Sequence, residues 1–222
     1  MSSGVILSLN MGGAEPNPAK NVPATGIGKR PVTHPVTVRP PGPKTTGLHS
    51  GLIGDYIGDV DHHGGDDQAI YAYAVEDYAW WSATLGRDLP HGLFGENLTT
   101  EGVDLLGAVI GERWAVGPEV VLQVTFGRIP CATFQHRMGE PRWIKRFAEA
   151  NRTGAYLRIV ESGAIRVGDR IEVRPRPAHG VTVTEAFEIY MHDASRLGRL
   201  LDADELPAGL RDDVERRLSR SA

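Results

Sequence analysis

The chain has 222 residues, a formal net charge of −4 and a hydrophobic content of 41%. This length accommodates one sizeable domain, or one domain with a small appendage. The slight acidic balance argues against a dedicated nucleic-acid binder, and no stretch reaches the roughly 20 apolar residues of a membrane span. A single cysteine and an N-terminus without a signal-peptide pattern favour a cytoplasmic protein with no membrane partner.

Short apolar or alternating runs predict a protein built mostly of β-strands. We expect strands at 5–9, 36–39, 69–73, 111–116, 120–126, 155–160 and 170–173. Residues 11–50 are rich in proline and glycine and should form long, ordered loops around one of these strands. Helices are expected at 76–85, which ends before Gly86, and at 143–150. Many short strands with few helices indicate a compact, barrel-like β domain.

The composition changes after residues 174–177. Helices are expected at 185–190, 194–201 and 207–218, the last beginning at Pro207, which suits a first helical position. Three short helices cannot build much core alone, so they should pack on the main domain or on another subunit, as in a homodimer. We therefore divide the chain into a domain at 1–176 and an extension at 177–222.

Cys131 is the only cysteine and cannot form an intrachain disulfide. It follows the expected strand 120–126 and Pro130, which would present the sulfur at a sheet edge with a restricted backbone. Arg128 lies three residues before it and favours the thiolate, the form that attacks and binds metals. The simpler alternative is a buried, inert thiol, because free cysteine is commonly a small core residue.

A polar loop carries the segment Asp61-His62-His63-Gly64-Gly65. Its adjacent glycines leave backbone N–H groups unshielded, which can form an anion-binding nest beside imidazoles that donate hydrogen bonds or protons. A polar turn with capping aspartates is the alternative. A zinc site that combines Cys131 with histidines lacks the usual ligand spacing.

Several short motifs occur in a specific order along residues 1–176. They are Lys29-Arg30-Pro31-Val32, Gly54-Asp55, His62-His63-Gly64-Gly65, Gly95-Glu96-Asn97-Leu98, Gly111-Glu112, Arg128-Ile129-Pro130-Cys131 and Gly168-Asp169. The ordered set resembles the MOSC family, named for the C-terminal domain of molybdenum cofactor sulfurases. The helical extension resembles that of the bacterial subgroup linked to resistance against 6-N-hydroxylaminopurine, often called YiiM-type. Gly127 and Ile57 stand where that subgroup commonly has proline and glutamine.

The resemblance implies a mainly β fold with some α, in which a MOSC β-barrel-like domain carries a small C-terminal helical extension. It also implies a molybdenum cofactor, that is, molybdopterin-bound molybdenum, with Cys131 as metal ligand or as carrier of a persulfide sulfur. Pyridoxal phosphate binding is a further association of the family. The implied catalytic residues are Cys131, His62 and His63, with the histidines as proton donors. The implied cofactor-binding residues are Lys29, Arg30, Gly64, Gly65, Glu96, Asn97 and Arg128.

The implied activity is an oxidoreductase that reduces N-hydroxylated bases or hydroxylamines in detoxification. No flavin, nicotinamide or iron–sulfur motif is present in the chain, so the electrons would come from a separate donor protein. One alternative is a non-catalytic carrier of molybdenum cofactor or persulfide sulfur. Another is an interaction module in which Cys131 is inert.

Overall fold

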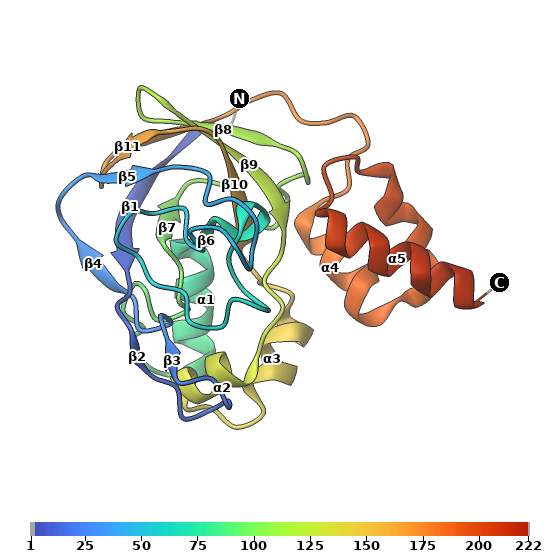
Figure 1. The fold of residues 1–222 in the computed structure, drawn as a ribbon, viewed down its shortest axis with the longest axis horizontal. Coiled ribbons are helices and arrows are strands. Elements are labelled where there is room, and N and C mark those ends of the chain that lie inside the picture. Colours follow the sequence, from blue (N-terminus) through green and yellow to red (C-terminus); the bar gives the residue numbers. More distant parts are fainter. Residues whose placement is uncertain (1–2, 222) are drawn as a thin grey trace.

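The computed structural model describes residues 3–221, and its centre is a closed β-barrel (Figure 1). The barrel strands are β1 (Ser3–Met11), β6 (Ile70–Ala74), β7 (Leu98–Glu101), β8 (Arg113–Val116), β9 (Val120–Phe126), β10 (Ala155–Glu161) and β12 (Arg170–Val173). Their order around the barrel is β12-β8-β9-β10-β6-β7-β1, and β1 pairs with β12 to close it. All of these pairs are antiparallel except β6 with β7. The expected mainly β, barrel-like fold is confirmed.

Shorter strands extend or flank the barrel. β4 (Arg30–Val32) pairs with the end of β1, so that Asn10 lies opposite Pro31. Two further pairs are β5 (Val36–Val38) with β11 (Gly163–Ile165), and β2 (Glu15–Pro16) with β3 (Ala24–Thr25). The proline- and glycine-rich region is therefore ordered by short strand pairs and long loops, as the sequence suggested.

Several barrel strands are buried on both faces, which explains their continuous apolar sequence. In β6, Ile70 and Ala72 face the barrel core, whereas Tyr71 and Tyr73 belong to a second cluster under the helices. In β9 every residue is buried, and Phe126 points to a third cluster under the C-terminal extension. Because side chains alternate along a strand, these two strands join all three cores.

Helices α1 (Val75–Leu85), α2 (Ala132–Met138) and α3 (Trp143–Ala150) cover one end of the barrel through aromatic packing (Figure 1). The rings of Tyr73 and Phe94 stack with centroids 4.4 Å apart, and Trp81 and Trp143 lie 4.5 Å apart. Each such buried ring stabilises the fold by roughly 2 to 3 kcal/mol. Gly86 closes α1 in the left-handed conformation, with φ +66°, which a residue without Cβ adopts at little cost.

The C-terminal extension consists of α4 (Val183–His192), η2 (Ala194–Asp202) and α5 (Ala208–Ser221), and lies at one side of the barrel in Figure 1. Thr182 caps α4 by accepting a hydrogen bond from the Glu185 N–H at 3.1 Å. The apolar side chains of these helices form one core with Phe126 and Ala148 of the barrel domain. The extension therefore packs on the main domain, which is one of the two arrangements expected.

The structure differs from expectation in several places. The segment 194–202 is a 3-10 helix, whereas 132–138 and 98–101 form a helix and a strand that were not expected. β7 has four residues, two of them threonines, and so short a sequence does not predict a strand by itself. Its pairing with β6 and β1 stabilises the strand in the structure. Within residues 3–221, the helices lack the combination of length and apolar character that crossing a bilayer requires.

Candidate functional site

Cys131 lies where two cavities meet. The empty space in the first cavity is about 640 Å³ and in the second about 1520 Å³, in each case including the part that is open to solvent. Five residues line both cavities, namely His63, Gly64, Gln68, Cys131 and Tyr156. The thiol is half-buried, so it borders both spaces while remaining partly shielded from bulk water.

The backbone holds Cys131 between β9 and α2. The residue precedes the first residue of α2 in an extended conformation, with φ −132° and ψ 171°. Burial by itself would raise the pKa of the Cys131 thiol. The His63 imidazole, the Arg128 guanidinium and the Phe134 backbone N–H all stabilise the thiolate, and together they lower the pKa from 9.0 to about 6. At neutral pH Cys131 is therefore mainly in the thiolate form.

Arg128 is a buried cation, with 5% of its surface exposed. Its Nη1 donates a hydrogen bond to the carbonyl oxygen of Phe94. The guanidinium carbon lies 5.1 Å from the centre of the Tyr71 ring and 4.2 Å from that of Phe134, a cation–π arrangement on both. Its Nε is buried and has no hydrogen-bond partner among residues 3–221, and the residue lines the first cavity.

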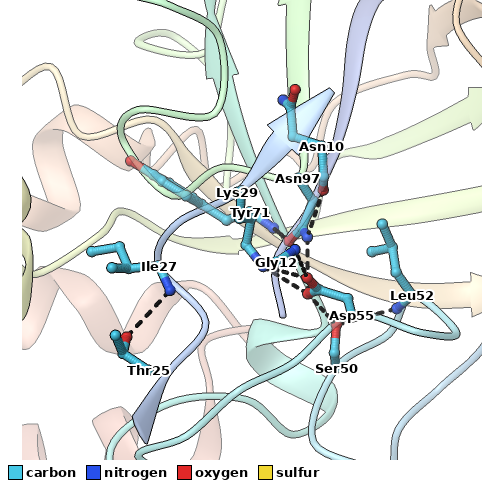
Figure 2. Close-up of polar contacts among 10 residues, drawn as sticks. All are labelled: Asn10, Gly12, Thr25, Ile27, Lys29, Ser50, Leu52, Asp55, Tyr71 and Asn97. Carbon is cyan, nitrogen blue, oxygen red and sulfur yellow. Dashed lines mark hydrogen bonds and ion pairs between the residues drawn. The ribbon is translucent and has the colours of Figure 1, made fainter. Parts of the chain in front are cut away.

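A second charged centre in this region is Asp55 (Figure 2). Its Oδ1 accepts hydrogen bonds from Lys29 Nζ at 2.6 Å and from the Gly12 N–H at 2.8 Å. Its Oδ2 accepts from Ser50 Oγ at 2.8 Å, from Lys29 Nζ at 2.7 Å and from Asn97 Nδ2 at 3.1 Å. The carboxylate therefore neutralises Lys29 and joins four separate segments of the chain, which the sequence motif Gly54-Asp55 did not reveal.

The structure brings most of the expected site residues to one cavity. Those that line the first cavity are Lys29, His63, Gly64, Asn97, Arg128 and Cys131. Asn97 is itself held in place, since its Oδ1 accepts from the Tyr71 N–H at 3.2 Å and its Nδ2 donates to the Asn10 carbonyl at 3.3 Å. It shapes the cavity wall, and its amide is largely engaged by the protein.

The structure places Arg30 outside the site. Arg30 is exposed on β4 and lines neither cavity, whereas the adjacent Lys29 is 7% exposed and points inward to Asp55. Neighbouring residues of an extended chain point to opposite sides, so only one member of this basic pair can face the cavity.

The two histidines are also separated. The His62 side chain is 69% exposed, and its Nδ1 lies 2.8 Å from Asp59 Oδ1. It lines only the second cavity, whereas His63 lines both and stands beside the Cys131 sulfur. Of the two expected proton donors, the geometry therefore favours His63.

The backbone conformation of Gly64 and Gly65 reflects close packing more than an open anion-binding nest. Gly64 and Gly65 have φ +83° and +77°, and a Cβ on Gly64 would stand 2.7 Å from the His49 carbonyl oxygen. The Gly65 N–H donates to that same oxygen at 2.9 Å, so it is not available to an anion, and Gly65 lines only the second cavity. Gly64 remains at the junction of the two cavities.

Glu96 is a fully buried structural carboxyl and lines neither cavity. Burial raises the pKa of Glu96, although hydrogen bonds from the Gly92 N–H, Tyr78 and Thr99 oppose that rise. Its part in the site is indirect, because it fixes the loop 92–96 that carries the Phe94 carbonyl, the acceptor for Arg128.

Gln68, Tyr71 and Tyr156 line the first cavity without having been identified from the sequence. The two tyrosines belong to apolar strands, where their alternation indicated only burial. Burial raises the pKa of both phenols, so they are neutral hydrogen-bonding groups at physiological pH. Within residues 3–221 no three His, Cys, Asp or Glu side chains are grouped to hold a metal ion, so the considered zinc site has no assembled ligand set there.

Comparison with known proteins agrees with this architecture. The family model described as MOSC domain matches residues 59–172. The uncharacterised protein YflK of Bacillus subtilis strain 168 is 32% identical over 194 residues, which cover 86% of this chain and 83% of YflK. A reductase of Gibberella moniliformis strain M3125 / FGSC 7600 is 29% identical over 161 residues, or 71% of this chain, but the match spans only 28% of that longer protein.

A solved structure extends the likeness over nearly the whole chain. The crystal structure of YiiM from Geobacillus stearothermophilus superposes with a TM-score of 0.77 at 26% identity, covering 97% of this chain and 99% of that one. The C-terminal helices are therefore part of the shared architecture. Since the domain match alone spans over half of the 222 residues, this chain belongs to the MOSC domain family.

Proposed function

We propose that the protein is a molybdenum-cofactor-dependent reductase of N-hydroxylated bases or hydroxylamines. The observation that carries this proposal is a half-buried thiolate, Cys131, at the junction of two cavities and beside a buried cation. Membership of a family associated with this cofactor, and a relative named as a reductase, support a redox role.

The residues around the first cavity fit such a cofactor. A thiolate is a suitable donor for a soft transition-metal centre, and the first cavity is lined by both Cys131 and the buried cation Arg128. Asp55 neutralises the charge of Lys29. Arg128 is therefore the cation that can still donate a hydrogen bond, because its Nε lacks a partner in the described chain. We assign Arg128 to the anionic part of the pterin and Cys131 to the metal. When bound, the cofactor supplies a centre that exchanges two electrons.

The protein's own residues account for the rest of the reaction. Reduction of an N–OH compound breaks the N–O bond, consumes two electrons and two protons, and yields an amine and water. His63 beside Cys131 is positioned to deliver a proton to the departing hydroxyl oxygen. The neutral phenols of Tyr71 and Tyr156 line the space and exclude water. The electrons come from a separate donor protein, and the lone free thiol suits a cytoplasmic location.

The decisive experiment is metal analysis combined with turnover. The protein and its Cys131→Ser variant are purified from a host that makes molybdenum cofactor, and reduction of 6-N-hydroxylaminopurine is followed with a chemical electron donor. We expect about one molybdenum per chain and turnover in the parent, and loss of both in the variant, because an alcohol is a far poorer soft-metal ligand.

Two controls give the result its meaning. Circular dichroism shows whether Cys131→Ser retains the fold, and His136→Gln changes an exposed side chain that lines neither cavity. Molybdenum without turnover would favour the cofactor-carrier alternative. A variant that keeps both metal and rate would remove Cys131 from the proposed site.

A further inference from the structure

The second cavity has no role in the cofactor assignment, although it reaches Cys131 from the other side. One of its walls comes from the barrel domain and includes Phe126, Ile129 and Pro130. The opposite wall comes from the C-terminal extension, where Pro207, Gly209 and Leu210 lie at the start of α5. The extension thus contributes directly to a cavity at the site, beyond the packing role expected from its sequence.

The lining of the second cavity favours an uncharged, largely flat ligand. Its apolar side chains offer a surface for a ring, and apart from Cys131 and the histidines its charged side chains are two lysines and two aspartates. Lys20 is paired with Asp59 at 2.8 Å, and Asp67 Oδ1 accepts from Arg158 Nε at 3.0 Å. The positive and negative side chains of the second cavity therefore balance, and their electrostatic potential does not favour binding of a phosphate.

Gln68 provides the polar contact at the inner end. Its side-chain Oε1 is buried without a hydrogen-bond partner among residues 3–221, and the residue lines both cavities. A primary amide presents a donor and an acceptor side by side, which is the complement of the edge of a nucleobase. A buried polar atom without a partner is costly, so a ligand that pairs with it gains free energy.

We propose that the second cavity binds the heterocyclic ring of the N-hydroxylated substrate, that Gln68 pairs with the ring edge, and that α5 forms the wall that limits ring size. This assignment rests on the proposed function. With the cofactor in the first cavity and the ring in the second, the N–O group would lie beside Cys131 and His63, two of the five residues that line both cavities.

Gly209 offers a clean test of the outer wall. A Cβ at Gly209 meets nothing within 4 Å, so a large side chain there narrows the cavity without disturbing the core. Gly198 is the matched control, because its Cβ position is equally open, it lies in the same extension and it lines neither cavity. The variants are Gly209→Trp, Gly198→Trp and the near-isosteric Gln68→Met, with circular dichroism as the fold check.

Two readouts are taken on each holoprotein: kcat/KM for 6-N-hydroxylaminopurine against that for hydroxylamine, and the Kd of adenine by equilibrium dialysis. We expect Gly209→Trp and Gln68→Met to lower kcat/KM for the purine and to weaken adenine binding by about tenfold or more, as loss of ring contacts or of an amide pair does. Hydroxylamine has no ring, so its reduction should change less than about twofold. Gly198→Trp should match the parent in both readouts.

The two readouts separate this inference from the proposed function. If the parent reduces neither compound but binds adenine in a manner sensitive to both variants, the reductase proposal fails and the ring site stands. If the parent reduces the purine and both cavity variants behave as it does, the ring site is overturned and the reductase proposal stands. A parent without adenine binding or purine turnover overturns both.

Discussion

Cys131 owes its low pKa to neighbours that come from different parts of the chain. His63 belongs to the loop before η1 (Asp66–Gln68), whereas Arg128 lies in the loop that follows β9. Since the thiolate is the reactive form, the rate of alkylation by iodoacetamide should rise through pH about 6 and level off near neutral pH. An ordinary thiol, with a pKa of 9.0, would still be gaining reactivity well above neutral pH.

The two histidines supply a matched pair for this measurement. His63→Gln should move the midpoint of the alkylation profile to higher pH, because the thiolate loses the hydrogen bond from the His63 imidazole that stabilises it. His62→Gln should leave the midpoint unchanged, since that ring is exposed and pairs with Asp59. Equal profiles for both variants would remove His63 from the sulfur's surroundings.

At the level of elements, Asp55 connects the long loops to the barrel. Its partners come from the segment after β1, the loop before β4, the loop near Ser50 and the turn that precedes β7. Asp55→Asn leaves the buried Lys29 ammonium without its counter-charge, so we expect the free energy of unfolding in urea to fall by about 3 kcal/mol or more.

A double variant distinguishes this charge effect from loss of packing. Lys29→Met combined with Asp55→Asn removes both charges, so it should be more stable than Asp55→Asn alone, because no uncompensated buried charge remains. Urea transitions of the two single variants and the double variant give the coupling free energy directly. A coupling near zero would show that Asp55 acts through its other hydrogen bonds.

Local sequence predicted the elements whose own residues carry the signal. β9 and β10 are long apolar strands, and α3 matches its expected range of 143–150, because period and flanking residues agree with the structure there. α2 has seven residues and no side-chain cap, and the 3-10 geometry of 194–202 depends on packing against α5. These features depend on packing between elements, which the local pattern of residues does not show.

For the molecule as a whole, the extension is part of the folded core. Removal of 177–222 would expose Phe126 and Ala148 to water. Exposure of a large apolar side chain lowers the free energy of unfolding by roughly 2 kcal/mol. We expect a chain that ends at Arg176 to aggregate or to change its oligomeric mass, measured by light scattering after size exclusion. A chain that ends at Leu218 keeps nearly all of the shared core and should behave as the parent.

The site as a whole was predictable only in part. Cys131 could be found because it is unique, and the resemblance in ordered motifs drew in His63, Arg128 and Lys29. The roles of Gln68 and Asp55 depend on where loops cross in space, which no local pattern encodes. The basic pair of Lys29 with Arg30 did carry one usable signal: neighbouring residues of an extended chain point to opposite sides, so only one of the two faces inward.

The pairing of β1 with β12 also has a consequence for the order of folding during synthesis. Gly4 pairs with Ile171, so β1, the first strand to be synthesised, can complete the barrel only after β12 has been synthesised. Until then, the apolar β1 and the edge of β8 lack a complete set of neighbours, and a nascent chain halted before residue 170 exposes them to aggregation. Barrel closure is thus a late, long-range step, and we expect a pause in translation before β12 to favour misassembly.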